Sequence, residues 1–445
     1  MLSGWAKASG DRAHRPRRQK TTAAARLFTM QAARASTISR PKRWLRILAW
    51  SIPALLVIGA GGYVAAAAAA PLPAPTLRTA AEQSTTRSAD AAAAQAAVDA
   101  QELPTAIGWL DGEKIWTNDE AAYPLASISK LITVLVAQEA QPLAPGEDGP
   151  SYTWTAADRE RQEQYLSLDG VAYPIPVGTE VTLREMLTLI FLPSANDFAA
   201  AYAYSVFGDN DAFVAAVNDW ADRHNLESLE FVEPTGMDEG NRANPADLIR
   251  IGRMALHNPT IAEFTSTQSA VMPWGIGLIE NTNPLLGELP GMLGIKTGRS
   301  ASAGFNFLAA QESTADGREV VKMSVTLARP SIAARAQSGR DMLAAVELLP
   351  ERVEIVAEGE ELGTLVGPDG SSVALLAAGE ASTTLLPGES VTRSVVLDEH
   401  AVSGEFGEIT VTTPSGDIVV PIRGEGTLTA PDLWWRITHP HVLFN

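Results

Sequence analysis

The chain of 445 residues has no cysteine and only six histidines. Without cysteine the protein has neither a thiol nucleophile nor disulfide bonds. No His-Glu-x-x-His segment or comparable histidine spacing occurs, so a zinc hydrolase, and a metal site in general, is not expected. The histidines lie near the chain ends or beside predicted helices, where a solvated or packed imidazole is the ordinary role: His14, His224, His257, His400, His439 and His441. Lysine therefore remains the candidate base for any serine hydrolase chemistry.

Positive charge is scarce outside the N-terminal region. Residues 1–46 hold 12 of the 34 Lys and Arg residues and one of the 52 acidic residues, Asp11. The rest of the chain is strongly acidic, which excludes nucleic acid as an expected partner. Residues 47–70 carry no charge and are long enough to cross a bilayer, and the basic flank predicts a cytoplasmic N-terminus. We expect a single-pass cell-membrane protein whose remaining domains are extracytoplasmic.

Two features after the apolar segment bear on this expectation. Residues 65–70 are all alanine, so a cleaved signal peptide is the alternative interpretation. The basic region before the apolar segment is much longer than in an ordinary signal peptide, which favours an uncleaved anchor. Residues 71–100 are rich in Ala, Pro, Thr and Ser and predict a flexible spacer from the membrane.

Three short signatures, far apart in the chain, together suggest a serine acyl-transfer site: Ser127-Ile128-Ser129-Lys130, Ser194-Ala195-Asn196 and Lys296-Thr297-Gly298. The first places a hydroxyl and an amine on one helix face, where the amine can take the hydroxyl proton. The second supplies a hydroxyl and a carboxamide, and the third a cation and a hydroxyl that can hold a carboxylate. A single fragment is weak evidence, because residues 39–42 also fit Ser-x-x-Lys within a basic tail. The prediction depends on the combination.

The context of each signature suits its chemistry. An apolar run over residues 131–136 predicts a buried helix with Ser127 at its N-terminus, where the backbone dipole stabilises developing negative charge. A capping box at Thr182 and Glu185 opens a predicted helix over 183–192, so that the second signature lies in a tight interhelical loop. The third signature ends a predicted edge strand over residues 291–298, with which an extended peptide could pair.

Over residues 101–350 the chain resembles the low-molecular-weight penicillin-binding proteins, the serine D-alanyl-D-alanine carboxypeptidases of the S11 type. Further stretches similar to that family are Leu192-Pro193-Ser194-Ala195-Asn196-Asp197, Pro234-Thr235-Gly236-Met237, Asp247-Leu248 and Ala303-Gly304. The chain departs from the family pattern at Ala195, Ser129, Ser300, Arg299 and the segment Asn241-Arg242-Ala243-Asn244. The first three departures are exchanges of small residues. Arg299 changes bulk and charge, and the segment could change the wall of the cleft.

The resemblance implies a role for each signature residue. Ser127 would attack the carbonyl of the penultimate D-alanine, with Lys130 as general base, neutral because of burial and of a neighbouring Lys296. Ser194 would pass the proton to the departing nitrogen. Asn196 would orient Lys130 and bind the substrate amide. Lys296, Thr297 and Gly298 would hold the terminal carboxylate, and the backbone N–H groups of Ser127 and Arg299 would form the oxyanion hole. No cofactor is implied, and the partners would be peptidoglycan stem peptides and β-lactam antibiotics.

Three alternatives remain open at this stage. A D,D-endopeptidase would use the same residues. A class A β-lactamase of the same superfamily needs a Glu-x-x-x-Asn segment for fast deacylation, and no asparagine of this chain has a glutamate four positions before it. A non-catalytic cell-wall-binding homologue would lack a catalytic group, and the signatures are complete here.

The segment pattern predicts the fold class. Strands near residues 104–117 and 305–327 with helices between them suggest an α/β (α+β) penicillin-binding or β-lactamase-like transpeptidase fold, an antiparallel sheet with a helical subdomain. Short apolar runs split by turns predict a small all-β domain after it. The expected divisions are a basic tail (1–46), a transmembrane anchor (47–70), a linker (71–100), the carboxypeptidase domain (101–350), the β domain (351–428) and an aromatic tail (429–445). The tail sequence Leu433-Trp434-Trp435-Arg436 suits either a membrane interface or packing on the β domain.

Overall fold

The computed structural model describes residues 43–398, 404 and 406–444, and these form two compact units. The expected basic tail therefore lies almost wholly outside the described residues, as do His14, His400 and the second Ser-x-x-Lys match at 39–42. One unit contains the N-terminal helix together with residues 436–444, and the other contains residues 72–435.

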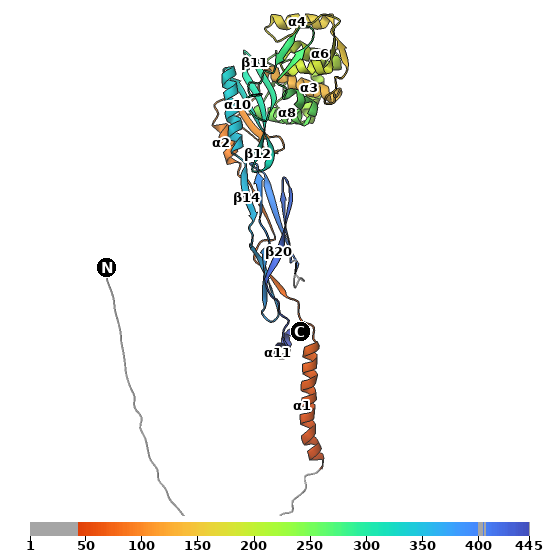
Figure 1. Ribbon diagram of the computed structural model, residues 1–445, viewed down its shortest axis with the longest axis vertical. Coiled ribbons are helices and arrows are strands. Elements are labelled where there is room, and N and C mark those ends of the chain that lie inside the picture. Colours follow the sequence, from red (N-terminus) through yellow and green to blue (C-terminus); the bar gives the residue numbers. More distant parts are fainter. Residues whose placement is uncertain (1–42, 399–403, 405, 445) are drawn as a thin grey trace, which may run out of the picture. The chain divides into compact units, whose positions relative to one another are not determined.

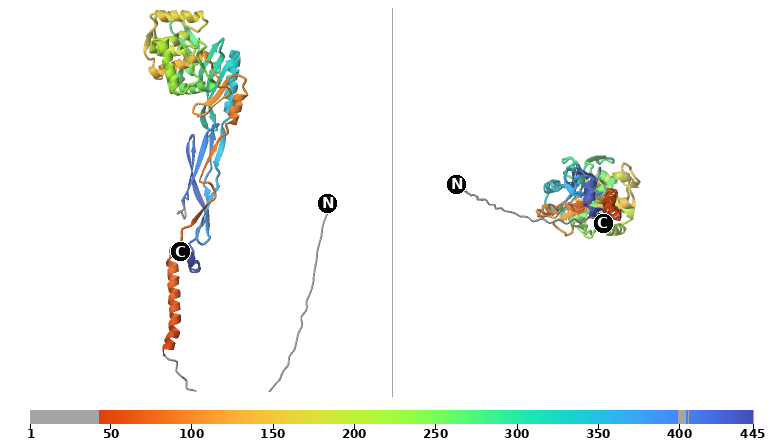
Figure 2. Two further views of the ribbon diagram at one scale, coloured as in Figure 1. Left: turned by 180° about the vertical axis from the view of Figure 1, so that it is seen from behind. Right: turned by 90° about the horizontal axis from the view of Figure 1, so that it is seen from below.

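The first unit is built on helix α1 (Arg43–Ala69), which Figures 1 and 2 show as one unbroken helix. Its segment Ile47–Ala69 is long and apolar enough to cross a membrane, and only 6% of its most apolar window is buried. Among the helix residues whose burial is described, only Ala67 near the C-terminal end is buried, and Ala70 just after the helix is buried too. There the last residues of helix α11 (Leu433–Thr438) pack on it, because Arg436 donates hydrogen bonds to the carbonyls of Ala68 (3.0 Å) and Ala70 (3.1 Å).

The second unit contains a five-stranded antiparallel sheet in the order β11-β12-β13-β3-β4. Its strands are β3 (Thr105–Trp109), β4 (Ile115–Thr117), β11 (Met292–Ser300), β12 (Gly304–Ala315) and β13 (Arg318–Arg329). Helices α2 (Ala92–Asp99) and α10 (Ile332–Glu347) cover one face, and α8 (Pro245–His257) packs on the other (Figure 1). The alternation of side chains along β3 explains this, since Ile107 and Trp109 join the α2 and α10 cluster while Ala106 joins the α8 cluster.

The helical subdomain lies between β5 (Tyr123–Pro124) and β11 in the sequence. Its elements are η1 (Ala126–Ile128), α3 (Ser129–Ala140), α4 (Ala156–Ser167), α5 (Leu183–Phe191), α6 (Asn196–Phe207), α7 (Asn210–Arg223) and α9 (Pro259–Thr265), with short strand pairs β5 with β8 (Arg242–Ala243), β6 (Ser151–Thr153) with β7 (Glu180–Thr182) and β9 (Ser269–Met272) with β10 (Gly277–Glu280). Helix α3 is central, because ten consecutive residues from Ser129 to Gln138 are buried. The predicted capping box is confirmed, with both reciprocal hydrogen bonds of Thr182 and Glu185 present at the start of α5.

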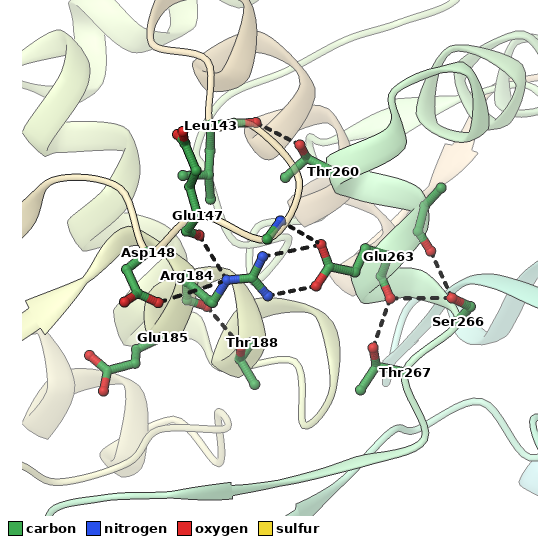
Figure 3. A network of polar contacts seen from close by, with 12 residues as sticks. Leu143, Glu147, Asp148, Arg184, Glu185, Thr188, Thr260, Glu263, Ser266 and Thr267 are labelled. Atoms are coloured by element: carbon green, nitrogen blue, oxygen red, sulfur yellow. Dashed lines mark hydrogen bonds and ion pairs between the residues drawn. The ribbon is translucent and has the colours of Figure 1, made fainter.

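An ion pair joins two of these helices at the protein surface. Figure 3 shows Arg184 of α5 with both guanidinium Nη atoms on the carboxylate of Glu263 in α9, at 2.6 and 3.1 Å. The same guanidinium donates to the carbonyl of Glu147, and Thr260 at the start of α9 donates to the carbonyl of Leu143. These contacts fix α5, and hence the loop that follows it, against the helix that precedes β11.

The C-terminal region is all β and has its own apolar core. Its strands are β14 (Glu351–Val356), β15 (Glu361–Val366), β16 (Ser372–Ala377), β17 (Ala381–Leu385), β18 (Ser390–Leu397), β19 (Gly407–Thr413) and β20 (Gly416–Gly426). The prediction of a flexible spacer over residues 71–100 is wrong, because this segment forms two strands and a helix. Strands β1 (Thr76–Thr79) and β2 (Ser84–Ser88) close the two edges of a seven-stranded sheet by pairing with β15 and β18, and α2 packs on the five-stranded sheet.

Candidate active site

The Ser127 hydroxyl and the Lys130 amine meet at the start of α3. Ser127 lies in the single 3-10 turn η1 that runs directly into α3, and Lys130 is in the first turn of that helix. Lys130 Nζ lies 2.8 Å from Ser127 Oγ. Lys130 is completely buried, whereas Ser127 lines an open cleft of about 370 Å³. The pair therefore has the geometry of a nucleophile and its base, within the 2.6 to 3.2 Å that proton transfer requires.

The loop around Thr235, to which the three signatures assign no role, contacts the Lys130 amine. Lys130 Nζ donates to the carbonyl of Thr235 at 2.7 Å. The carboxylate of Glu233 shapes this loop by accepting the backbone N–H groups of Thr235 and Gly236. Gly236 has a φ of +81°, and a Cβ there would lie only 1.8 Å from the carbonyl oxygen of Ala126. Glycine is thus required for the loop to pack on η1, the turn that carries Ser127.

The second signature occupies the loop between α5 and α6, as expected. Ser194 has a φ of +70°, a left-handed conformation that is unusual for serine, and its Oγ accepts a hydrogen bond from Lys296 Nζ at 2.9 Å. Asn196 is buried at the start of α6 and lines the cleft. Among the described residues no hydrogen bond joins Asn196 to Lys130, and the Asn196 amide lies close against Gly170.

The third signature lies on β11, which is an edge strand of the five-stranded sheet. Thr297 Oγ1 is 2.7 Å from the hydroxyl of Thr282, and Thr297 lines the cleft. A Cβ on Gly298 would lie 2.5 Å from the carbonyl oxygen of Leu125. Because this position has no side chain, β11 can pass directly beside the turn that carries Ser127.

Burial brings the pKa of Lys130 close to neutral pH. Desolvation lowers its pKa to about 7, against the opposing effects of the carboxylates of Glu233 and Asp197. The expectation that Lys296 contributes to this shift is not supported, since the charged neighbours acting on Lys130 are acidic. Instead, Lys130 lowers the pKa of Lys296. That pKa lies well below its usual range, mainly because Lys296 is buried and also because Lys130 and Arg335 are cations nearby.

Comparison with known proteins identifies the family. The family model described as D-alanyl-D-alanine carboxypeptidase, peptidase S11, matches residues 111–328. The carboxypeptidase DacB2 of Mycobacterium tuberculosis is 32% identical over 209 residues, which cover 46% of this chain and 67% of the relative. The chain belongs to the S11 peptidase family.

Other relatives of this S11 peptidase match over shorter stretches. DacF of Bacillus subtilis is 30% identical over 40% of this chain, and a D-alanyl-D-alanine endopeptidase of Pseudomonas aeruginosa is 31% identical over 34%. The chain spans about half the length of both relatives, 45% in each case. The solved structure of penicillin-binding protein 5 from Haemophilus influenzae is 20% identical, with a TM-score of 0.51, over 74% of this chain and 97% of that one. The expected fold class is therefore confirmed.

One residue lining the cleft of the S11 peptidase was missed by the sequence interpretation. Arg335 in α10 is 5% exposed, and its Nη2 donates to the carbonyl of Thr282 at 3.2 Å. No ion pair joins Arg335 to an acidic side chain within the described residues, and its Nε has no hydrogen-bond partner. Burial lowers its pKa to about 10, and it remains charged at neutral pH. No motif marks this position, because an arginine in a helix is ordinary. A buried arginine without a counter-ion is nevertheless a candidate for binding an anionic ligand.

Proposed function

We propose that this S11 peptidase is a serine D-Ala-D-Ala carboxypeptidase that removes the terminal D-alanine of peptidoglycan stem peptides through an acyl-enzyme. The observation that carries the proposal is the contact of Ser127 with a buried lysine whose pKa lies near 7. The same cleft holds Thr297 and Arg335, groups that can bind a terminal carboxylate. The nucleophile and the carboxylate site thus line one cleft, and the base lies buried directly behind the nucleophile.

In the acylation step Ser127 attacks the carbonyl carbon of the penultimate D-alanine while neutral Lys130 accepts the hydroxyl proton. The backbone N–H groups of Ser127 and Arg299 would stabilise the oxyanion, and loss of one such donor typically costs about a hundred- to a thousandfold in rate. When the C–N bond breaks, Ser194, whose Oγ accepts a hydrogen bond from Lys296, gives its proton to the departing nitrogen and takes up the proton held by Lys130, which leaves Lys130 neutral again. Water then hydrolyses the ester, with its proton returning through Lys130, and frees Ser127.

The carboxylate end of the cleft favours a free C-terminal acid. Thr297 offers a hydroxyl that is oriented by Thr282, and Arg335 offers a buried guanidinium that has no acidic partner among the described residues. A charged hydrogen bond at such a site contributes about 1.5 to 3 kcal/mol. This arrangement supports a carboxypeptidase over an enzyme that cuts only within a chain. The endopeptidase reading remains the second candidate, because endopeptidases of Pseudomonas aeruginosa and Escherichia coli are among the relatives.

β-Lactam antibiotics are the proposed second class of ligand. A β-lactam would acylate Ser127 by the same attack, with its carboxylate at Thr297 and Arg335. The chain lacks the Glu-x-x-x-Asn segment that speeds deacylation in class A β-lactamases, so the acyl-enzyme should persist.

We further propose that α1 anchors the enzyme in the cell membrane with the catalytic domain outside. The apolar segment Ile47–Ala69 and the basic residues before it support this orientation. At the end of this segment the Tyr63 hydroxyl donates to the carbonyl of Ile437. In α11 the side chain of Trp434 is 73% exposed, which suits the interface between lipid and water.

The test uses the full-length protein in detergent. We expect release of D-alanine from an acyl-D-Ala-D-Ala peptide and covalent labelling by a fluorescent penicillin, both lost in Ser127→Ala. The matched control is Ser266→Ala, which removes a hydroxyl at the exposed end of α9 and should leave both signals intact. Penicillin labelling with cleavage of cross-linked dimers, but without release of D-alanine from the acyl-D-Ala-D-Ala peptide, would favour the endopeptidase. Absence of both signals from the wild type would overturn the proposal in favour of a non-catalytic homologue.

A further inference from the structure

The cleft contains a second cation that the proposed carboxypeptidase chemistry does not use. Arg299 follows Gly298 on β11, and its exposed side chain lines the cleft. Asp169 is the one acidic residue in the lining of this cleft. No ion pair or side-chain hydrogen bond involves Arg299 in the part of the chain that the structure describes. Its charge is therefore available to a ligand.

The strand geometry places this charge beside the carboxylate site. Thr297 and Arg299 are two residues apart on β11, so their side chains lie on the same face of the strand. Across the sheet Arg299 pairs with Phe305, and the guanidinium carbon of Arg335 lies 6.0 Å from the centre of the Phe305 ring. Arg299 also lowers the pKa of Arg335, as expected for two cations within interaction range.

The number of charges at this end of the cleft exceeds what a D-alanine leaving group needs. A terminal carboxylate brings one negative charge, for which Thr297, Lys296 and Arg335 already supply donors. Arg299 adds a positive charge, and a D-alanine leaving group has no second carboxylate to neutralise it. Two neighbouring arginines are mutually repulsive, and a second anion between them would remove that repulsion.

We propose that Arg299 makes the site selective for leaving groups that carry a second carboxylate besides the terminal one. The proposal rests on the proposed acyl-transfer function and specifies its leaving-group class. The second carboxylate can belong to the side chain of the leaving D-residue or to a longer leaving stem peptide. In both cases Arg299 acts on specificity while the bond-breaking chemistry stays with Ser127 and Lys130.

The experiment compares isosteric leaving groups with the full-length enzyme. The first arm measures kcat/KM for acyl-D-Ala-D-Glu against acyl-D-Ala-D-Gln, which differ by one charge. The second arm compares a cross-linked dimer whose leaving stem has free carboxylates with the same dimer amidated. We expect a preference for the acidic member of about two- to fivefold, the range of an exposed ion pair. The preference should weaken as ionic strength rises from about 0.01 M to about 1 M, because the Debye length shrinks.

Two variants assign the preference to Arg299. Arg299→Gln should bring the ratio within each arm to about one, and Arg299→Lys should keep part of the preference. Arg423→Gln removes one surface charge from β20 and should retain the wild-type ratio. A preference that Arg299→Gln abolishes in the first arm places the second carboxylate on the leaving D-residue, and one abolished in the second arm places it on the leaving stem peptide. A ratio near one for the wild type in both arms, or a preference retained in Arg299→Gln, would overturn the inference while acyl-D-Ala-D-Ala is still cleaved. Failure to cleave any substrate, with no penicillin labelling, would instead overturn the proposed function and this inference with it.

Discussion

Acidification below pH 7 is expected to switch off acylation of Ser127, because Lys130 then holds a proton and cannot accept another. The size of the expected effect follows from the lowered pKa of Lys130. A lysine with the ordinary pKa of 10.5 would have roughly 0.03% neutral amine at pH 7, whereas a pKa of about 7 gives about half. Burial thus supplies on the order of a thousandfold more active base at neutral pH. Below the pKa the neutral fraction, and with it the rate, should fall about tenfold per pH unit.

The assay is the second-order rate constant for acylation by a fluorescent β-lactam, followed between about pH 5 and about pH 9. This reaction isolates the first step from deacylation and product release. The expected profile rises with a slope of one and levels off above about pH 7. Lys130→Arg is the control, because a guanidinium keeps the charge but does not lose its proton, and it should abolish acylation throughout.

A flat profile, or a midpoint near the ordinary lysine pKa, would refute the reasoning that burial prepares the base. Acylation retained in Lys130→Arg would refute the assignment of the base itself. Loss of folding is a separate outcome, which circular dichroism of each variant at the same pH detects.

Two further predictions concern the cleft, and a third concerns the β domain. Arg335→Met should raise the KM of a peptide with a free terminal carboxylate about tenfold or more and leave that of its terminal amide nearly unchanged, as steady-state kinetics would show. Lys130→Met should be more stable than the wild type at pH 6 by up to about 5 kcal/mol in denaturant unfolding, because the wild type buries a charge there. Since the native pKa is depressed, wild-type stability should rise between about pH 7 and the unfolded pKa of 10.5, and the variant should lose that rise. Leu77→Asp should destabilise the β domain, because Leu77 packs against its core, and a lowered unfolding midpoint would show it.

The parts of the site that local sequence determines could be predicted. The spacing of Ser127 and Lys130 brings the hydroxyl and amine together because both lie at the start of one helix. The capping box at Thr182 depends on four neighbouring residues, and the edge position of β11 follows from its small residues and its place after the helices. The strands of the C-terminal region were also predictable, since alternating apolar runs between Gly-rich and Pro-rich turns are a local pattern.

What the sequence could not show depends on partners far along the chain. Strands β1 and β2 are short, polar and rich in Thr and Ser, so their composition resembles a linker. They become strands because unpaired sheet edges of the β domain accept them, and Thr76 lies 290 residues from its partner Val366. The roles of Glu233 and Arg335 could not be predicted for the same reason. The contacts of Glu233 with the loop, and the burial of Arg335 without an acidic partner among the described residues, arise only when the chain folds. The position of the Asn196 amide against Gly170 is likewise decided by tertiary geometry.

Lys130 and Lys296 respond differently to their surroundings, and this difference has a consequence for the bound state. Acidic groups at Glu233 and Asp197 favour the charged form of Lys130, whereas cationic groups at Lys130 and Arg335 disfavour the charged form of Lys296. A substrate carboxylate placed at Thr297 and Arg335 would raise the pKa of Lys296, and a charged Lys296 would in turn lower that of Lys130. The ligand itself would thereby increase the fraction of neutral base. Acylating agents that carry the carboxylate should therefore show a lower midpoint in the pH profile than their esters or amides, and equal midpoints would mean that the two lysines titrate independently.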